Sequence, residues 1–450
     1  MADLTEKIVS LCKRRGFVIP GSEIYGGLAN SWDFGPLGVE LKNNIKNLWW
    51  QRFVHRKDDI VGLDSAIIMN PSVWEASGHL REFSDPLVEC KKCHFRFRID
   101  KIPGARFERK GDASFFNVDM SVARCPNCGV GGTPENFTLP ELFNLMFKTN
   151  LGPTKGNEVY LRPETAQGMF VDFKNILDSN RLTLPFGVAQ IGKAFRNEIT
   201  TGNFIFRLRE FEMMEIEYFI KEKDWKKYFE YWQKEILDWI KEIGINIKNI
   251  HEIEIPEGER AHYSKRTVDF DYDFPFGREE LYGLAYRTDF DLKNHEKFSG
   301  KNLKYKDPET NEEFWPHVIE PTWGLERSVL AILCESYFED RERVVLRLNP
   351  KLAPYKAAVF PLLANKPELV KLAREIYENL RKELFVAWDD RGNIGKRYYS
   401  QDEIGTPFCI TVDFESLENG DVTIRDRDTM KQERVKIKDL AQIINKKISE

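Results

Sequence analysis

Two Cys-x-x-Cys pairs constrain the middle of this 450-residue chain more than any other feature of the sequence. Cys90 and Cys93 form the first pair, and Cys125 and Cys128 form the second. A CxxC turn can aim both of its sulfurs at one metal ion, and four thiolates complete the tetrahedral shell of Zn²⁺. Such a shell has no open coordination position, so we predict a structural zinc site. Four thiols without a metal are the alternative, and His94 in place of one thiolate is a weaker one.

The segment that carries these pairs differs in composition from its surroundings. Residues 86–138 are rich in Cys, Arg, Gly and Phe and have little periodic pattern, which indicates an insertion. The chain has seven cysteines, an odd number, and four of them stand at metal spacing. In a reducing cytosol this usage favours a metal over disulfides.

Charge and hydropathy exclude several classes of protein. A net charge of -5 argues against a chain that coats nucleic acid non-specifically. It leaves room for an RNA-binding enzyme, because phosphate contacts need only a local basic surface. We expect no signal peptide and no membrane span, since no long uncharged apolar run occurs. These features predict a cytoplasmic protein with no membrane partner.

Hydrophobic periodicity predicts an α+β chain that ends in a separate α/β module. We expect an amphipathic helix over 38–56, a strand over 60–70, two strands within 187–220, a helix over 223–243, strands around 267–292 and a helix from Gly324. Beyond a boundary near 348–355, a strand, a helix and three further strands form the module. The predicted units are a core in two parts (1–85 and 139–347, with a helical insertion near 223–262), the insertion 86–138 and the module 348–450.

One phosphate-binding pattern is rejected. Residues Gly187 to Lys193 match seven positions of a P-loop, but Ala194 stands where the loop requires Ser or Thr. A P-loop presents backbone N–H groups at a helix N-terminus. The residues that follow predict a strand, so that context is missing.

Another set of residues suits nucleotide binding better. Arg196 and Glu198 end one predicted strand, and Arg207 and Phe211 begin the next. An arginine fork can neutralise an α-phosphate, a carboxylate can accept from the adenine amino group, and a phenylalanine ring can stack on a purine. Farther along, Arg327 at a helix start can reach the outer phosphates. The pattern predicts an ATP site.

These segments resemble the class II aminoacyl-tRNA synthetases, in particular the dimeric type of glycyl-tRNA synthetase. FRNE with RLREFEMMEIEYF resembles motif 2, WGLERSVLAIL resembles motif 3, and the 38–56 helix with the strand ending at Pro71 resembles motif 1. The family signatures, which run from near residue 23 to near residue 430, are WDFGPLGVELKNNIKNLWW, VWEASGH, LRPETAQG, RAHYSKRTVDFDYDFPFG, YRTDFDLKNH, EPTWGLER, QDEIGTPFCITVD and VTIRDRDT.

The resemblance implies a catalytic set of Arg196, Glu198 and Arg327. Arg196 would hold the α-phosphate, Arg327 the γ-phosphate, and Glu198 the adenine amino group. The implied ATP-binding set is Arg196, Glu198, Arg207, Phe211, Glu280 and Arg327. Glu280 and Glu320 would be placed to coordinate Mg²⁺ or to orient substrate. The implied glycine-binding set is Glu164, Glu215, Arg287, Glu320 and Thr322.

Some of these positions fit other interpretations. Thr322 departs from motif 3, which has Gly there, and from the glycyl family, which usually has Ser. Glu280 and Arg287, taken alone, are typical of surface ion pairs.

The resemblance also implies an antiparallel class II catalytic sheet with a zinc-binding insertion and a C-terminal α/β anticodon-binding domain. Implied tRNA contacts are Arg391, Lys396, Arg397, Arg425 and Arg427. A self-neutralising strand edge is the alternative for Arg425 to Asp428. We also predict a homodimer formed by the 38–71 element, because the apolar surface that includes Trp49 and Trp50 exceeds what one helix face can bury internally.

The implied activity is that of a glycine–tRNA ligase. It would activate glycine with ATP and then esterify it to the 3′ end of tRNA(Gly), with Mg²⁺ and a structural Zn²⁺ as cofactors. A class II synthetase for another small amino acid is the first alternative. A non-catalytic accessory subunit is the second, although it should have lost Arg196, Glu198 or Arg327.

Overall fold

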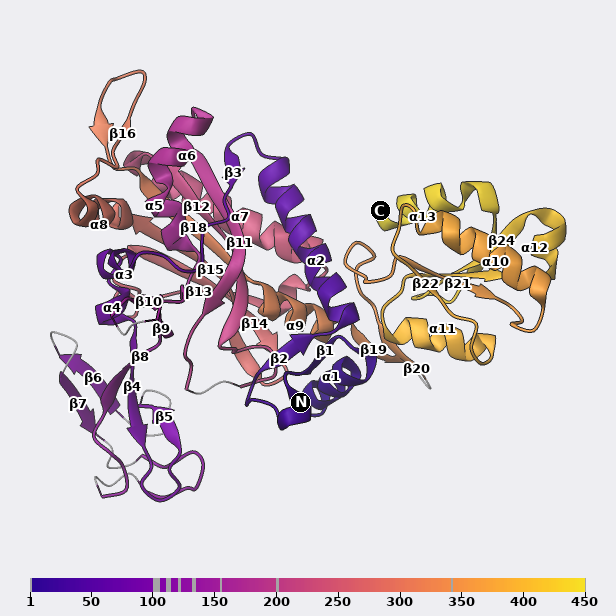
Figure 1. Ribbon diagram of the computed structural model, residues 1–450, viewed down its shortest axis with the longest axis horizontal. Helices are drawn as coiled ribbons and strands as arrows, with labels where there is room; N and C mark the ends of the chain where they lie inside the picture. The colour runs from indigo at the N-terminus through magenta and orange to yellow at the C-terminus, as the bar shows by residue number, and fades with distance from the viewer. Residues whose placement is uncertain are drawn as a thin grey trace.

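The computed structural model describes residues 2–99, 106–110, 115–119, 123–131, 135–153, 156–199, 202–340 and 343–449. Parts of the predicted insertion, 100–105, 111–114, 120–122 and 132–134, therefore lie outside the described residues. Figure 1 shows a large unit built on a long sheet, a small module below it and a C-terminal unit beside it. No described helix has both the length and the apolar character to cross a membrane.

A seven-stranded sheet forms the centre of the large unit, in the order β13-β14-β15-β18-β12-β11-β3. All neighbours are antiparallel except β3, which runs parallel to β11. The strands are β3 (Ile60–Gly62), β11 (Phe186–Phe195), β12 (Glu210–Ile220), β13 (Ile250–Glu254), β14 (Arg266–Phe274), β15 (Gly277–Thr288) and β18 (His317–Gly324). The two strands predicted within 187–220 and the strands near 267–292 are confirmed.

Helices cover both faces of this sheet (Figure 1). The first face carries α2 (Pro36–Trp50), α7 (Trp225–Glu242) and α9 (Leu325–Ser336). Their apolar sides meet in one core, in which the Phe53 ring lies 4.9 Å from Trp323 and 5.9 Å from Trp232. The second face carries α5 (Ala166–Val171), α6 (Phe173–Asn180) and α8 (Phe290–Ser299).

The remaining elements of the large unit lie around its edges. They are α1 (Ala2–Arg15), β1 (Val18–Pro20), β2 (Trp32–Phe34), α3 (Pro71–Ala76), α4 (His79–Glu82), β9 (Lys148–Asn150), β10 (Glu158–Tyr160), β16 (Tyr305–Lys306), β17 (Glu313–Phe314), β19 (Tyr337–Asp340) and β20 (Arg343–Leu346).

The helix predicted over 38–56 is present, and its last part, Gln51–His55, is a π-helical turn. Trp49 is completely buried in its own chain, and the ring of Trp50 covers Gly62 so closely that a Cβ there would lie 2.4 Å from it. The premise that this apolar surface exceeds what the chain can bury is therefore wrong.

Two other expectations about elements need correction. The strand predicted over 60–70 ends at Gly62, and Ile68 makes only an isolated bridge to Leu161. The chain leaves the sheet there because the Ser65 carbonyl turns to accept from Arg162 at 2.8 Å. The expected helical insertion near 223–262 contains α7 and a 3-10 turn at Ile247–Asn249, but β13 within the same range is the edge strand of the main sheet.

The P-loop pattern lies inside β11, where Gly187 pairs with Tyr218 on one side and with Ile60 on the other. Its backbone groups are committed to the sheet, so the rejection of a phosphate loop was correct.

The cysteine module is entered through β4 (Ser84–Glu89) and left through β8 (Glu141–Asn144). These two strands form a three-stranded sheet with β5 (Arg96–Arg98), and β6 (Arg106–Lys110) pairs with β7 (Phe115–Asp119). The return strand β8 follows residue 138, so the module extends beyond the predicted range 86–138.

The C-terminal unit contains a mixed five-stranded sheet in the order β22-β21-β23-β24-β25. Its strands are β21 (Ala357–Pro361), β22 (Val386–Trp388), β23 (Phe408–Val412), β24 (Asp421–Asp426) and β25 (Gln432–Lys436). Its helices are α10 (Pro367–Leu380), α11 (Ile394–Glu403), α12 (Phe414–Asn419) and α13 (Leu440–Ser449). Sequence periodicity predicted the first four strands and α10, and it missed α11, which covers the opposite face of the sheet from α10 (Figure 1).

Candidate active site

A cavity of about 620 Å³ opens where β11, β12 and β15 meet the start of α9. All members of the predicted ATP-binding set line it: Arg196, Glu198, Arg207, Phe211, Glu280 and Arg327. The residues 82–85, which lead into the cysteine module, line it from the other side. The structure thus brings together six residues that are up to 131 positions apart in the sequence.

Arg196 lies just beyond β11, where the pairing with β12 ends. Its Nε donates to the carbonyl of Pro163 at 3.0 Å. Its guanidinium lies 5.4 Å from the ring centroids of both Phe83 and Phe211. Cation–π attraction to two rings fixes the head group at the cavity wall. This arrangement presents a fixed positive charge next to an aromatic face.

Arg327 occupies the first turn of α9 and also lines the cavity. Its Nη1 donates to the Glu280 carbonyl at 2.8 Å and lies 3.0 Å from the Glu280 carboxylate. Burial alone would raise the pKa of Glu280, but the charge and hydrogen bond of Arg327, together with the charges of Arg196 and Arg207, outweigh burial and lower that pKa. A second cation and an ionised carboxylate therefore face the cavity together.

Asp269 and Thr322 lie beside Glu280 above Gly283. A Cβ on Gly283 would lie 3.0 Å from the Thr322 hydroxyl, 3.8 Å from a Glu280 oxygen and 3.9 Å from an Asp269 oxygen. Burial and the negative charges of Glu280 and Asp271 raise the pKa of Asp269 to about 7. Clustered carboxylate oxygens of this kind attract hard cations such as Mg²⁺.

The predicted glycine-binding carboxylates lie behind this cavity. Glu215 and Glu320 are buried, and their oxygens lie within 4.8 Å of each other and of the Glu217 carboxylate. The Thr165 hydroxyl donates to Glu215, and Nη1 of Arg287 donates to Glu320 at 2.5 Å. The sheet register places Glu215 opposite Thr322, so Thr322 lies between the acidic cluster and the cavity.

Glu217 is a member of this cluster that we did not predict. It is fully buried, and neither of its carboxylate oxygens has a hydrogen-bond partner. Burial and the neighbouring Glu320 charge raise its pKa well above the usual range. Strand alternation was the available signal, because Phe211, Met213, Glu215 and Glu217 share one face of β12.

Arg287 is not a surface ion-pair residue. It is buried, its Nε and Nη2 donate to Asp291 at 2.8 and 2.9 Å, and it lies 3.7 Å from the Tyr263 ring centroid. Glu164 is buried nearby, where Gln167 and His79 contact its two oxygens. Arg287 lies on β15 and Asp291 on α8, so their pairing follows from the turn between these elements and not from helical spacing.

The structure does not bring the two predicted Mg²⁺ ligands together. Glu280 lines the cavity with Arg327, whereas Glu320 lies in the buried cluster and accepts from Arg287. Coordination of Mg²⁺ by these two residues therefore stays a prediction, and their carboxylates lie in different parts of the site. Asp269 is the carboxylate that lies beside Glu280.

The four predicted thiolates converge. Sγ of Cys90 lies 3.7 Å from Sγ of Cys128, Sγ of Cys93 lies 3.7 Å from Sγ of Cys125, and all four sulfurs are within 4.8 Å of one another. A tetrahedron with Zn–S bonds of about 2.3 Å has S···S edges of about 3.8 Å. Hydrogen bonds from Asn127 and the Phe95 backbone lower the pKa of Cys93 to about 6. The described cluster fits a four-thiolate metal site.

Comparison with known proteins gives matches over most of the chain. Residues 147–337 match the tRNA synthetase class II core domain (G, H, P, S and T), and residues 356–447 match the anticodon binding domain. The glycine–tRNA ligase of Geobacillus thermodenitrificans (strain NG80-2) is 51% identical over 100% of this chain and 98% of its own length. That of Alkaliphilus oremlandii (strain OhILAs) is 50% identical over 98% of each chain. This chain belongs to the glycine–tRNA ligase family.

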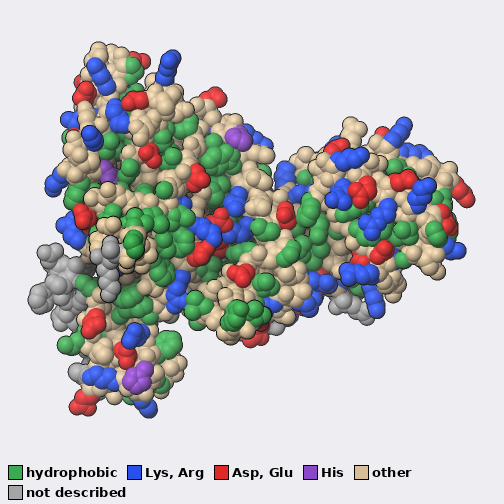
Figure 2. All heavy atoms as spheres, viewed as in Figure 1, with side chains coloured by type: hydrophobic (Ala, Val, Ile, Leu, Met, Phe, Trp, Pro, Cys, Tyr) green, Lys and Arg blue, Asp and Glu red, His purple; other side chains and the backbone are tan. Residues whose placement is uncertain are grey.

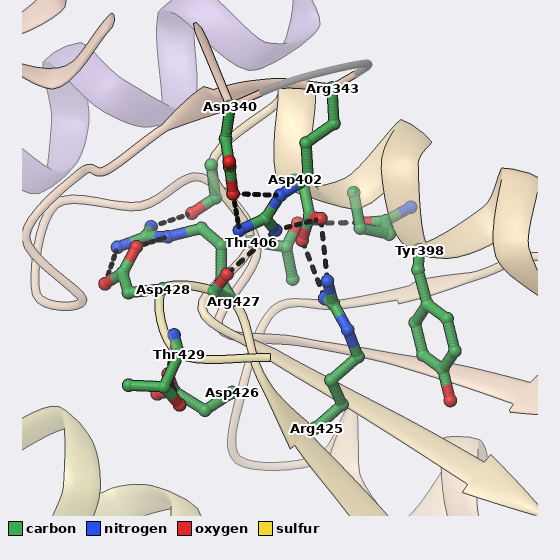
Figure 3. A network of polar contacts seen from close by, with 12 residues as sticks. Asp340, Arg343, Tyr398, Asp402, Thr406, Arg425, Asp426, Arg427, Asp428 and Thr429 are labelled. Carbon is green, nitrogen blue, oxygen red and sulfur yellow. Dashed lines mark hydrogen bonds and ion pairs between the residues drawn. The ribbon is translucent and has the colours of Figure 1, made fainter. Parts of the chain in front are cut away.

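In this member of the glycine–tRNA ligase family, three arginines predicted to contact tRNA are buried in the anticodon binding domain. Figure 3 shows two of them, Arg425 and Arg427, with their polar contacts. Arg425 donates two hydrogen bonds to Asp402, and Arg427 donates to the Gly405 and Leu348 carbonyls and to Asp428. Arg397 donates to the carbonyls of Pro361, Asp390, Arg391 and Gly392. Their predicted contacts with tRNA are wrong, because every one of these head groups holds the domain together.

Arg391 and Lys396 are the exposed members of the predicted tRNA set. The Arg391 side chain is 91% exposed, compared with 4% for Arg425. Arg427 does pair with Asp428, as the alternative interpretation expected, but both residues follow the end of β24 and β24 is not an edge strand; Arg425 pairs with Asp402 on α11.

Proposed function

We propose that this chain activates glycine with ATP and transfers it to the 3′ end of tRNA(Gly). One observation carries the proposal: a cavity lined by two cations, Arg196 and Arg327, and an aromatic face adjoins a buried carboxylate cluster. The cations suit a polyphosphate, and the carboxylates suit an ammonium group. The identity of about half of all residues to glycine–tRNA ligases over their full length supports the choice of amino acid.

In the first step, a carboxylate oxygen of glycine attacks the α-phosphorus of ATP. An O–P bond forms, the bond from the α-phosphorus to the bridging oxygen breaks, and pyrophosphate leaves. Two anions must approach, so positioning and charge neutralisation provide the catalysis. Arg196 would neutralise the α-phosphate, Arg327 would hold the far phosphates, and the purine would stack on Phe211 beside Glu198.

The amino acid would be chosen by its ammonium group and by the lack of room at its α-carbon. Glu215, Glu320 and Glu164 would attract the ammonium, with the Thr322 hydroxyl at the entrance. In a yielding apolar pocket, one extra methyl changes selectivity by only about 1–3 kcal/mol. Here a methyl would also displace charged contacts, and we expect alanine to be rejected more strongly.

Mg²⁺ bound with ATP would neutralise phosphate charge and favour departure of pyrophosphate. Glu280 and Asp269 are the residues of this chain that would hold it, because their carboxylates converge beside Arg327.

In the second step, a hydroxyl of the terminal tRNA ribose attacks the carbonyl carbon of the adenylate, and AMP leaves. We propose that the tRNA also contacts the anticodon binding domain through Arg391 and Lys396. On the face seen in Figure 2, basic and acidic side chains are mixed over this domain, so such contacts would be local. Readout of single-stranded loops by individual side chains needs no large basic field.

Zn²⁺ would be held by Cys90, Cys93, Cys125 and Cys128, in a closed shell that only stabilises the module. We expect about one zinc per chain by metal analysis, as four thiolates bind one ion. Cys125→Ser should lower the zinc content and make the module sensitive to chelators. If the purified protein contained no zinc and its folding did not change with a chelator, this site would be excluded.

We retain the homodimer and the cytoplasm as proposals. The argument from Trp49 no longer supports a dimer, but the segment between β1 and β2 does. Its Ile24 and Tyr25 side chains are 88% and 86% exposed in the single chain, and Leu28 is exposed beside them. An exposed apolar group of this kind suits a protein partner. Light scattering at micromolar concentration should give the mass of a dimer.

The test of the proposed activity is ATP–pyrophosphate exchange with each amino acid in turn. Glycine alone should support rapid exchange, and subsequent charging should require tRNA(Gly). Exchange with another small amino acid and not with glycine would identify a different class II synthetase. Absence of exchange with all amino acids would favour a non-catalytic subunit.

A further inference from the structure

A buried polar chain links the segment between α3 and α4 to the carboxylate of Glu164. The hydroxyl oxygen of Ser77 lies 2.8 Å from Nδ1 of His79, and Nε2 of His79 lies 3.2 Å from a carboxylate oxygen of Glu164. Ser77, His79 and Glu164 are all buried. Gly78 between the first two has a φ of 84°, a conformation that favours glycine and that lets α3 and α4 meet at a sharp turn.

The hydrogen-bond donor between His79 and Glu164 can be assigned from chemistry. An ionised carboxylate only accepts hydrogen bonds, so Nε2 of His79 carries the hydrogen that points at Glu164. The imidazole ring is fixed from its sides by Trp74 and Phe83, with centroid distances of 5.5 and 5.3 Å. Ser77 fixes it from behind. The ring therefore has one orientation and one hydrogen-bond target.

Glu164 is held from two directions. Nε2 of Gln167 donates to its other oxygen at 2.9 Å and also to Asp291 at 3.1 Å. Nε2 of His295 in turn lies 2.8 Å from the Gln167 carbonyl oxygen. Each carboxylate oxygen has a second lone pair, so both can still accept from a ligand. Burial would raise the pKa of Glu164, but the contacts with His79 and Gln167 and the charge of Arg287 together lower it.

The three residues have the composition of a hydrolytic triad, but the geometry excludes that role. A nucleophilic serine must reach its substrate. Ser77 is 2% exposed, and its oxygen also lies 3.4 Å from the Trp74 carbonyl. The group that faces the other functional carboxylates is Glu164, whose charge acts on Glu215 and Glu320. Ser77 and His79 therefore hold the Glu164 carboxylate in place.

We propose that His79 is a positioning residue for glycine recognition: its Nε2–H aims the Glu164 carboxylate at the glycine ammonium, and Ser77 sets the ring. This inference rests on the proposed function. Neither Ser77 nor His79 lines the nucleotide cavity, so substitutions of either residue should change glycine binding and not ATP binding. His79 also stands five residues before β4, so the entry to the cysteine module and the glycine pocket share one anchor.

The test measures glycine-dependent exchange for wild type, His79→Ala, His79→Gln and Ser77→Ala, with His251→Ala as the control. His251 is partly exposed on β13 and pairs with Asp273. His79→Ala should raise the KM for glycine about ten- to a hundredfold, as expected for one lost hydrogen bond to a charged group. The KM for ATP should stay within about twofold. His79→Gln, whose amide can replace Nε2–H, should recover most of the loss, and His251→Ala should behave as wild type.

A second arm asks whether His79 acts through Glu164. In a Glu164→Gln background, His79→Ala should add little to the KM for glycine, because the carboxylate it aims is already gone. Equal changes in both KM values, an unchanged KM for glycine, or no recovery by His79→Gln would each overturn the proposal. If His79→Ala does not fold, His79→Gln and Ser77→Ala decide the matter by the same two KM values. No exchange by the wild type would instead overturn the proposed function.

Discussion

The two halves of the candidate active site differ in how their charges are satisfied. The ATP half is an open cavity in which Arg196 and Arg327 present cations to the space that a polyphosphate would fill. The glycine half is buried, and most of its charges already have partners: Glu320 has Arg287, Glu164 has His79 and Gln167, and Glu215 has Thr165. In the first half, only Arg327 of these two cations has an acidic partner among the described residues, Glu280, and the cavity leaves room for a polyphosphate, whereas the second half is preorganised.

The difference implies two kinds of mutational effect. Removing a cavity cation should reduce activity and leave the fold intact, because the head groups of these arginines lie at the wall of an open cavity. Changing a residue of the buried half should affect glycine binding and stability together, because each carboxylate is also a structural element. The predictions below test this division, from the largest expected effect to the smallest.

Arg196→Ala and Arg327→Ala should each reduce glycine-dependent exchange by at least about a hundredfold, on the scale of losing a preorganised charge at a reacting phosphate. Thermal unfolding should shift little, because both side chains border the cavity. Arg278→Ala, which removes an exposed arginine paired with Asp273, is the matched control. Near-normal exchange by either variant would mean that the ATP half is wrongly assigned.

Glu215→Gln should raise the KM for glycine by about one to two orders of magnitude, because a hydrogen bond to a charged group contributes about 1.5–3 kcal/mol. The KM for ATP should change little, since other residues hold the nucleotide. Equal changes in the two parameters would contradict the separation of the halves, and a neutral result would make Glu215 a scaffold residue.

Glu217→Gln should stabilise the protein at neutral pH by on the order of 1 kcal/mol, because an unpaired buried carboxylate is replaced by a neutral isostere. The folded-state pKa of Glu217 is raised, so the wild type loses stability as pH rises from the unfolded value of about 4.3 towards the folded one. Urea unfolding should therefore show a small difference near pH 4 that grows as pH rises. A constant difference would show that Glu217 does not titrate in this range.

Arg391→Ala with Lys396→Ala should raise the KM for tRNA by a few-fold, about what one or two exposed phosphate contacts contribute, and should leave exchange unchanged. Arg425→Ala should instead lower the free energy of unfolding by about 3–5 kcal/mol, because it leaves Asp402 with one fewer partner in a buried site. A tRNA effect from Arg425→Ala without loss of stability would reverse the distinction between these arginines.

The same division explains which site residues could be predicted from the sequence and which could not. Arg196, Phe211 and Arg327 could be predicted because each keeps its functional group in the cavity and its motif spacing reports a strand end or a helix start. Glu217, Asp291 and His79 were missed because their importance arises only from which strands and helices lie side by side. The tRNA assignments failed at Arg397, Arg425 and Arg427. The sequence does not distinguish an arginine whose head group donates to buried protein acceptors from one whose head group is free to contact phosphate.

Asp402 has a consequence for how this protein can be divided. Its carboxylate is completely buried on α11 and accepts from Arg425 within the anticodon binding domain and from Arg343 on β20 of the large unit (Figure 3). The sequence boundary near 348 passes between these partners. A fragment of residues 348–450 made alone would keep Asp402 and Arg425 but lose Arg343. Excision would therefore expose to solvent an ion pair that is buried in the intact chain. Transplanting this domain onto another synthetase core would require a host that supplies an arginine at the position of Arg343.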